Sequence, residues 1–253
     1  MNFFDVIFLS IVEGITEFLP ISSTGHLILT SKILGIEQDS FQTSFQIAIQ
    51  LGSILAVVFL FWQKFLRASI WLRLIVAFIP TGFCGLFLYK YIRSLFDANI
   101  VAYMLIIGGI LFIILELYLK DKSPKVQNLE SISLKKAFLI GCFQSLAMVP
   151  GTSRSGATIF GGLILRLDRK VATEFSFLLA VPTMIIAVSY DTYKHIGDFS
   201  NENIMFILIG MLFSFIFALV AIKTLLRFIS KFSYISFGIY RIFIGTIFLI
   251  FIL

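Results

Sequence analysis

The sequence predicts an all-α, polytopic membrane protein, and three observations support this prediction: composition, the length of the apolar runs and the placement of charge. Of the 253 residues, 59% are hydrophobic and only 13% are charged, and the mean hydropathy is +1.01. Soluble domains are about 45–50% apolar, so this composition is typical of a chain that lies largely in lipid. The net charge of +6 lies mainly between the apolar runs, as membrane topology requires, and we therefore exclude nucleic acid as a partner.

Six apolar runs are long enough to cross a bilayer, because roughly 20 helical residues span about 30 Å of hydrocarbon. They lie near 43–63, 69–92, 99–119, 173–193, 204–223 and 235–253. We expect each run to form one transmembrane helix.

Two pairs of shorter apolar runs are interrupted by Pro, Gly, Ser and Thr. The pairs are 3–19 with 24–35, broken at 20–25, and 134–149 with 157–166, broken at 150–156. Non-helical backbone at membrane depth has to be buried in protein or to line a wet cavity. We therefore expect two re-entrant helical hairpins with site residues at their tips. The alternative is that all four short pieces cross the membrane, which gives ten spans.

An internal repeat relates the two hairpins, because an offset of 130 residues aligns Pro20 with Pro150 and Ser23 with Ser153. Within a single integral membrane domain, 1–253, we predict repeat one at 1–119, a linker at 120–133 and repeat two at 134–253. Each repeat then holds one re-entrant hairpin and three transmembrane helices. An odd number of crossings turns the second repeat upside down, so inverted-topology repeats follow, in the ten-span alternative as well.

The distribution of Lys and Arg orients the chain in the membrane. These residues are concentrated in 64–73, 120–136, 166–170 and 223–231, whereas the other side carries only Lys32, Lys90, Arg93 and Lys194. By the positive-inside rule the first side is cytoplasmic. Both termini then face outward, and the first hairpin enters from the outside.

Two carboxylates, Glu13 and Glu17, lie in the Phe-rich first hairpin. Their spacing of four places both on one helical face. A charged side chain at the centre of a bilayer costs roughly 2.5–3.5 kcal/mol, so the pair indicates function. Two neighbouring carboxylates can act as acid, base or cation ligand.

Three hydroxyls and an imidazole follow the break in the same hairpin, on Ser22, Ser23, Thr24 and His26. The unpaired N–H groups of a helix start favour anions. Hydroxyl, imidazole and carboxylate together are the groups used in nucleophilic or acid–base catalysis. The structural alternative is that the hydroxyls only cap and pack helices.

The second hairpin carries one arginine among hydroxyls and glycines. Its candidate site residues are Gly151, Ser153, Arg154, Ser155 and Thr158. The guanidinium fork suits phosphate oxygens, and glycine lets backbone approach a ligand, so we predict a phosphate site here. Arg241 is the remaining cation within a predicted span, and the sequence leaves open whether it reaches the surface or faces the site.

These motifs resemble the undecaprenyl-diphosphatase family, the bacterial BacA-type membrane phosphatases. The similarity is carried by Glu13-x-x-x-Glu17-Phe-Leu-Pro-Ile-Ser-Ser-x-x-His26 and by Pro150-Gly-x-Ser-Arg-Ser-x-x-Thr158. It extends to Phe45-Gln-x-x-Ile-Gln-Leu-Gly52, to Glu174-Phe-Ser-Phe-Leu-Leu-Ala-x-Pro182-Thr and to Tyr240-Arg241. One departure is Gln46, where the family often has Glu, and it puts an acid–base role at that position in doubt.

The resemblance implies an enzyme of the bacterial inner membrane that hydrolyses undecaprenyl diphosphate to undecaprenyl phosphate and inorganic phosphate. This reaction recycles the lipid carrier of cell-wall synthesis and depends on a divalent cation, Mg²⁺ or Ca²⁺. The partners implied are the polyprenyl diphosphate and membrane lipids, and a homodimer is one option for the assembly.

Carried over to this chain, the resemblance assigns each site residue a role. The catalytic residues would be Glu17, Ser23, His26 and Arg154. Glu13 and Glu17 would hold the cation. The substrate-binding residues would be Ser22, Thr24, Gly151, Ser153, Ser155, Thr158 and Arg241. Ser23 is the preferred nucleophile, with its proton moved by Glu17 or His26, and direct attack by water is the competing mechanism.

Two other functions compete with this interpretation. Thr24-Gly-His26 and Ser153-Arg154 resemble motifs of the type-2 phosphatidic-acid phosphatases, but the nucleophilic His of that superfamily would fall at position 160, where this chain has Phe160. Inverted repeats with broken helices are also typical of transporters, so a lipid-phosphate flippase or an anion transporter is the alternative.

Overall fold

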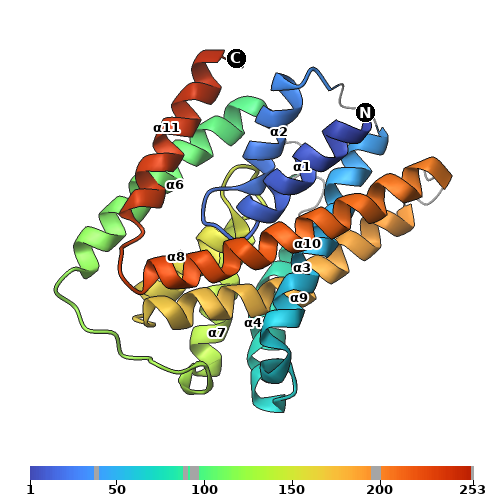
Figure 1. Cartoon of the computed structure of the whole chain (residues 1–253). Coiled ribbons are helices and arrows are strands. Elements are labelled where there is room, and N and C mark those ends of the chain that lie inside the picture. Colours follow the sequence, from blue (N-terminus) through green and yellow to red (C-terminus); the bar gives the residue numbers. More distant parts are fainter. Residues whose placement is uncertain (37–39, 88–90, 92–96, 195–200, 252–253) are drawn as a thin grey trace.

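The fold is built from helices, as the sequence predicts. The structure, a computed structural model, describes residues 1–36, 40–87, 91, 97–194 and 201–251. In this part of the chain the elements are helices, with one isolated bridge between Val126 and Leu167 (Figure 1). They are α1 (Phe3–Thr16), α2 (Ser23–Ile33), α3 (Ser40–Phe65), α4 (Ala68–Phe87), α6 (Ala98–Leu119), η1 (Leu129–Ser131), α7 (Leu134–Leu146), α8 (Arg154–Ile164), α9 (Arg169–Lys194), α10 (Asn201–Ile229) and α11 (Ile235–Phe251).

Five of the described helices are long and apolar enough to cross a membrane, in agreement with a multi-pass membrane protein. They contain Phe41–Phe65, Ala68–Phe87, Ala98–Leu119, Arg169–Tyr190 and Ile204–Ile229. The sixth predicted crossing corresponds to α11, an apolar helix of 17 residues. The last residues of the predicted runs 69–92 and 235–253, and the cations Lys90 and Arg93, lie outside the described residues.

Large apolar side chains cover the outside of these helices. Phe59 and Trp62 of α3, Phe83 of α4 and Leu208 of α10 each expose more than half of their surface. A soluble monomer rarely exposes so much apolar surface, whereas lipid accepts it.

The four short helices form two pairs, α1 with α2 and α7 with α8. The breaks lie at 17–22 and 147–153, which is about three residues earlier than the sequence predicts. The reason is the N-cap: the Ser22 side chain accepts a hydrogen bond from Gly25 N (3.4 Å), and the Ser153 side chain accepts one from Gly156 N (3.1 Å). Each serine thereby starts a helix whose first turn contains the polar residues that the sequence assigns to the break.

Both N-cap serines have the same unusual backbone conformation. Their φ angles are 71° and 75°, in the left-handed region that residues other than glycine rarely adopt. Ser22 and Ser153 are 131 positions apart, one more than the offset of 130 that the sequence suggests. This local correspondence pairs Ser23 with Arg154, since each is the first residue of its helix.

Each pair of short helices rests on a long helix from the other half of the chain: α1 packs on α10, and α7 packs on α4. A glycine makes the close approach possible at both contacts. A Cβ added at Gly14 would lie 2.5 Å from the carbonyl oxygen of Ser214, and one at Gly141 would lie 1.9 Å from that of Ala77. The two halves are therefore interleaved.

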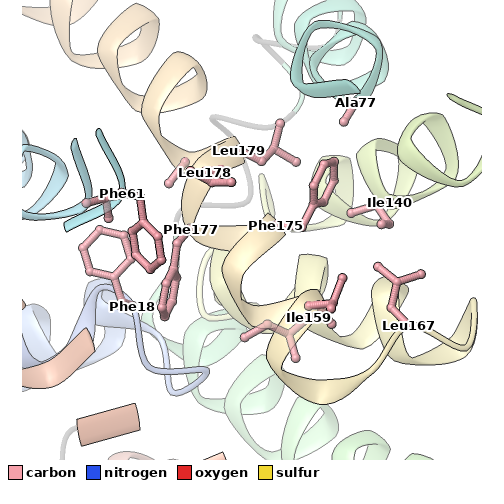
Figure 2. Packing of buried hydrophobic residues seen from close by; sticks show 14 of the residues in the cluster. Phe18, Phe61, Ala77, Ile140, Ile159, Leu167, Phe175, Phe177, Leu178 and Leu179 are labelled. Carbon is pink, nitrogen blue, oxygen red and sulfur yellow. The ribbon is translucent and has the colours of Figure 1, made fainter. Parts of the chain in front are cut away.

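A buried aromatic cluster lies directly behind the first break (Figure 2). Phe18 of this break packs edge-to-face against Phe177 of α9, with ring centroids 5.2 Å apart, and Phe61 of α3 packs beside them. All three rings are buried. Because Phe18 follows Glu17 in sequence, the cluster fixes the backbone that carries this carboxylate.

The charged segments gather at one end of the molecule, away from both termini (Figure 1). Lys64 pairs with Glu174, Arg67 pairs with Glu130 at 2.5 Å, and Arg73 donates to Ile132 O. These contacts join 64–73 to 120–136 and to α9, and hydrogen bonds from Lys125 N to Arg166 O and from Asp168 N to Val126 O join the linker to 166–170. The linker therefore packs on the helical body.

We expect Gly141→Ala to lower stability by about 1–3 kcal/mol, because the new methyl group would collide with backbone and not with a side chain that can move. Thermal unfolding in detergent measures the effect. The matched control is Gly85→Ala, whose methyl group would meet only the end of the Met148 side chain at 3.3 Å. Equal melting temperatures for the two variants would contradict the close contact of α7 with α4.

Candidate active site

The Glu17 carboxylate joins the two breaks. Glu17 is the C-cap of α1, and its side chain is buried. Oε2 accepts a hydrogen bond of 2.6 Å from Ser23 Oγ at the start of α2, and Oε1 accepts one of 2.8 Å from Arg154 Nη2 at the start of α8. A hydroxyl, a carboxylate and a guanidinium thus form one continuous chain of hydrogen bonds.

Arg154 is held in place by its surroundings. Nη1 donates to Ser176 O at 3.1 Å, and the guanidinium lies over the Phe18 ring, 5.5 Å from its centroid. Its Nε is buried and has no acceptor among the described residues. A buried donor without a partner is costly, so an incoming oxygen at this atom would stabilise the site.

Glu13 lies one helical turn before Glu17 and is fully buried, near Ser53 of α3. Neither of its carboxylate oxygens, nor the Ser53 hydroxyl, has a hydrogen bond within the part of the chain that the structure describes. Two buried carboxylates next to each other repel unless a proton or a cation lies between them. These oxygens fit a cation ligand.

His26 contacts Tyr240 and not Ser23 in the hydrogen bonds of the described residues. Its Nδ1 lies 2.7 Å from Ser22 O, and its Nε2 lies 2.8 Å from the Tyr240 hydroxyl. The two rings are nearly parallel, with an interplanar angle of 6°. Because a carbonyl only accepts, Nδ1 carries the hydrogen, and neutral His26 accepts from Tyr240 at Nε2.

The other residues of the predicted site divide into two groups. Thr24 is exposed and Ser23 is half-buried, so the start of α2 is accessible. Ser155 and Thr158 are buried and already paired, with Leu19 O (2.9 Å) and with the Ser176 hydroxyl (2.6 Å). The members of the second group connect helices instead of presenting free hydroxyls.

Arg241 of α11 is completely buried and points at both breaks. Its side chain carries five N–H groups, and each donates to a backbone carbonyl oxygen. The acceptors are Pro20 (3.2 Å), Met104 (2.9 Å), Leu105 (3.2 Å), Gly151 (3.1 Å) and Thr152 (3.0 Å). It neither reaches the surface nor has a donor free for a phosphate, which argues against the substrate-binding role expected for it.

The sequence matches, over residues 6–247, the family described as Bacitracin resistance protein BacA. The chain belongs to this family. A relative from Wolinella succinogenes is 58% identical over 253 residues, which cover 100% of this chain and 99% of the relative. Relatives from Sulfurihydrogenibium sp. (56% over 248 residues, 98% of each chain) and Campylobacter jejuni (58% over 242 residues, 95% of this chain and 91% of the relative) are similar to the same extent. All three relatives are named undecaprenyl-diphosphatase.

Two features of this BacA family member went undetected by the sequence reasoning. Tyr240 was noted only as part of a familial motif, although its hydroxyl is the partner of His26. Ser53, whose buried hydroxyl has no hydrogen-bond partner among the described residues, has no sequence feature that marks it apart from its position in an apolar run. Gln46, the departure from the family pattern, donates to Ser31 Oγ at 3.2 Å, away from the chain of Ser23, Glu17 and Arg154.

The Glu17–Arg154 ion pair predicts a measurable coupling. Breaking a buried pair costs roughly 3–5 kcal/mol, because it leaves an uncompensated charge in the interior. Glu17→Gln and Arg154→Met should each destabilise the protein, while the double variant loses about 1–3 kcal/mol less than the sum of the two. Reversible unfolding in mixed micelles measures this double-mutant cycle.

The pair Arg67–Glu130 is the matched control, since its side chains are 62% and 53% exposed. Its coupling should stay below about 1 kcal/mol. If the two cycles gave the same coupling energy, Glu17 and Arg154 would not form a buried ion pair.

Proposed function

We propose that the chain is an integral membrane phosphatase that hydrolyses undecaprenyl diphosphate to undecaprenyl phosphate and inorganic phosphate. In a bacterium this reaction recycles the lipid carrier of cell-wall synthesis. Support comes from the family and from the names of the relatives. The observation that carries the proposal at the level of residues is the hydrogen-bonded chain from Ser23 through Glu17 to Arg154.

Binding begins with the diphosphate taking the place of Glu17 on Arg154. The guanidinium offers a planar fork for two phosphate oxygens, and its orphaned Nε adds a third donor. The first turns of α2 and α8 contribute backbone N–H groups that the helices leave unpaired. Together they neutralise charge as the bridging bond breaks.

In the reaction, Ser23 Oγ attacks the terminal phosphorus and its proton passes to Glu17 Oε2. The bond between the terminal phosphorus and the bridging oxygen breaks, and undecaprenyl phosphate leaves with that oxygen, which takes the proton from Glu17. Water then attacks the phosphoserine and gives one proton to Glu17, which passes it to Ser23 Oγ as inorganic phosphate leaves. His26 has no hydrogen bond with Ser23, and its two ring nitrogens are paired with Ser22 O and the Tyr240 hydroxyl, so we assign the proton of Ser23 to Glu17.

Glu13 and Glu17 would hold Mg²⁺ or Ca²⁺. The orphaned Glu13 oxygens fit this role. No group of three or more His, Cys, Asp or Glu side chains suited to a metal occurs among the described residues, so phosphate oxygens and water would complete the shell. When bound, the cation neutralises charge on the phosphoryl group.

We further propose that the two pairs of short helices are re-entrant hairpins and that the halves are inverted-topology repeats. Support comes from the matching N-caps at Ser22 and Ser153 and from the interleaved packing of α1 on α10 and α7 on α4. The charge-rich end, opposite both termini, would face the cytoplasm, so both termini would lie outside the plasma membrane. The repeat boundaries and a homodimer stay predictions.

The flippase or anion-transporter alternative is less favoured. A transporter needs only a site that binds its substrate. A hydroxyl that is hydrogen-bonded to a buried carboxylate, as Ser23 is to Glu17, is instead the arrangement of an activated nucleophile. The relatives are also named as diphosphatases and not as carriers.

Replacement of the nucleophile tests the mechanism. We expect Ser23→Ala to lower kcat for phosphate release from undecaprenyl diphosphate by at least about 100-fold, because covalent catalysis loses its attacking atom. Ser131→Ala, at an exposed serine of η1, is the control. Retention of more than roughly a tenth of wild-type turnover by folded Ser23→Ala protein would favour direct attack by water.

Cation binding can be tested without activity. A ligand that binds only the folded state raises the melting temperature, so Mg²⁺ or Ca²⁺ should stabilise the wild-type protein in detergent. We expect Glu13→Gln to lose this stabilisation, while Glu130→Gln, at an exposed carboxylate, keeps it. The same cation-dependent shift in Glu13→Gln would exclude Glu13 as a ligand.

A further inference from the structure

We propose that Arg241 is a positioning residue that fixes the tips of the two hairpins relative to each other. The tips are 17–22, which precedes α2, and 147–153, which precedes α8. By holding them together, Arg241 sets the distance from Glu17 and Ser23 in the first hairpin to Arg154 in the second. The catalytic part of this inference rests on the proposed function, whereas the positional part does not.

The first argument is that the guanidinium is saturated. Its five N–H groups are divided among three segments: Pro20 in the first tip, Gly151 and Thr152 in the second tip, and one turn of α6. No donor remains for an anion. One side chain therefore links two tips that are about 130 residues apart in the sequence with a third element that belongs to neither.

The second argument concerns the acceptors. Pro20 and Gly151 are buried in non-helical backbone, where their carbonyl oxygens have no helical N–H to pair with. Burying a carbonyl without a partner costs about 1–3 kcal/mol. The rigid fork of arginine satisfies several such oxygens at fixed angles, whereas lysine offers three donors from a single atom.

The third argument is that the fold keeps space for this side chain. A Cβ added at Gly108 of α6 would lie 2.2 Å from Arg241 Nη2. Beside it, α6 and α11 approach through paired glycines: a Cβ at Gly109 would lie 2.5 Å from Gly238 O, and one at Gly238 would lie 2.7 Å from Gly109 O. The two helices, adjacent along their length in Figure 1, form a stiff frame for the guanidinium.

The second tip and the start of α2, which follows the first tip, also contact α6 directly. Gly151 has a φ of +88°, and a Cβ there would lie 2.5 Å from Val101 O. Gly25, in the first turn of α2, is packed against the side chains of Val101 and Leu105, where a Cβ would lie 3.4 Å and 3.3 Å from them. Arg241 thus fastens the tips at a place where the second tip and the helix after the first tip already contact the frame.

The consequence for the site is geometric. Glu17 and Ser23 belong to the first hairpin and Arg154 belongs to the second, so the hydrogen bond from Arg154 to Glu17 depends on the relation between the tips. A displacement of about 1 Å can cost on the order of 100-fold in rate. A residue that prevents such a displacement affects turnover more than substrate binding.

The test uses full-length protein in detergent and two variants that disturb the fastening from opposite sides. Arg241→Lys keeps the charge and removes the fork, while Gly108→Ala keeps the arginine and displaces it. Gly82→Ala is the control for adding a methyl group to a helical glycine, because this methyl group would meet only the Phe78 side chain of the same helix. Hydrogen exchange followed by mass spectrometry reports on peptides from both tips, and phosphate release gives kcat and KM.

We expect both variants to speed amide exchange in both tips together, by roughly tenfold, while exchange in α4 stays at the wild-type rate. In both, kcat should fall at least about tenfold and KM should change less than about threefold. Adding Gly108→Ala to Arg241→Met should have little further effect, because the collision partner is gone. Gly82→Ala should behave as wild type.

Wild-type exchange in both tips of Arg241→Lys and Gly108→Ala would overturn the proposal. An increase in KM at unchanged kcat in Arg241→Lys would also overturn it, since that pattern indicates a phosphate ligand. If the tips loosen as expected but the wild-type protein releases no phosphate from the lipid, the positional role stands and the proposed function fails.

Discussion

Buried backbone without helical partners is the constraint on which this structure depends. Two breaks in the chain lie inside a bundle of apolar helices, where their carbonyl and N–H groups need hydrogen-bond partners from the protein itself. Arg241 supplies the donors to Pro20, Gly151 and Thr152, and the hydroxyls of Ser22 and Ser153 supply acceptors at the two helix starts. The irregular segments exist because the protein provides these partners itself.

The same constraint places the polar side chains of the candidate site. A helix start that is capped from within leaves the side chain of its first residue, Ser23 or Arg154, free to reach Glu17. Glu17 ends α1, and the next residue, Phe18, packs its ring against that of Phe177 (Figure 2). Strained serines, close glycines and a buried carboxylate are thus parts of one arrangement.

Much of the fold could be predicted from the sequence, because lipid imposes long apolar runs that composition reveals, and Pro and Gly mark where they are broken. The helix starts at Ser23 and Arg154 could not, since the left-handed serine caps leave no local pattern. The difference of one residue between the repeat offset of 130 and the spacing of the two N-caps has the same origin. The sequence could not show whether Arg241 reaches the surface or faces the site, because its acceptors are backbone carbonyls, which every sequence contains.

The candidate site was predictable as a set of residues but not as a set of contacts. The first motif contains a hydroxyl, an imidazole and a carboxylate, so the sequence indicates Glu17 and His26 equally as the group that moves the proton of Ser23. The folded chain distinguishes these two candidates, because Ser23 donates to Glu17, whereas His26 pairs with Tyr240, which is more than 200 residues away in the sequence. Such long-range pairs follow from packing and have no signature in local spacing.

The salt bridge between Glu17 and Arg154 has one more consequence. In this structure the Arg154 guanidinium already pairs with an internal carboxylate, so under the proposed function a phosphate would enter by exchange with Glu17. Displaced from the guanidinium, the carboxylate would keep Ser23 as its hydrogen-bond donor. Entry of the substrate would thus turn Glu17 from its partner Arg154 to the hydroxyl that it deprotonates, so the ion pair couples substrate entry to the first step of the reaction.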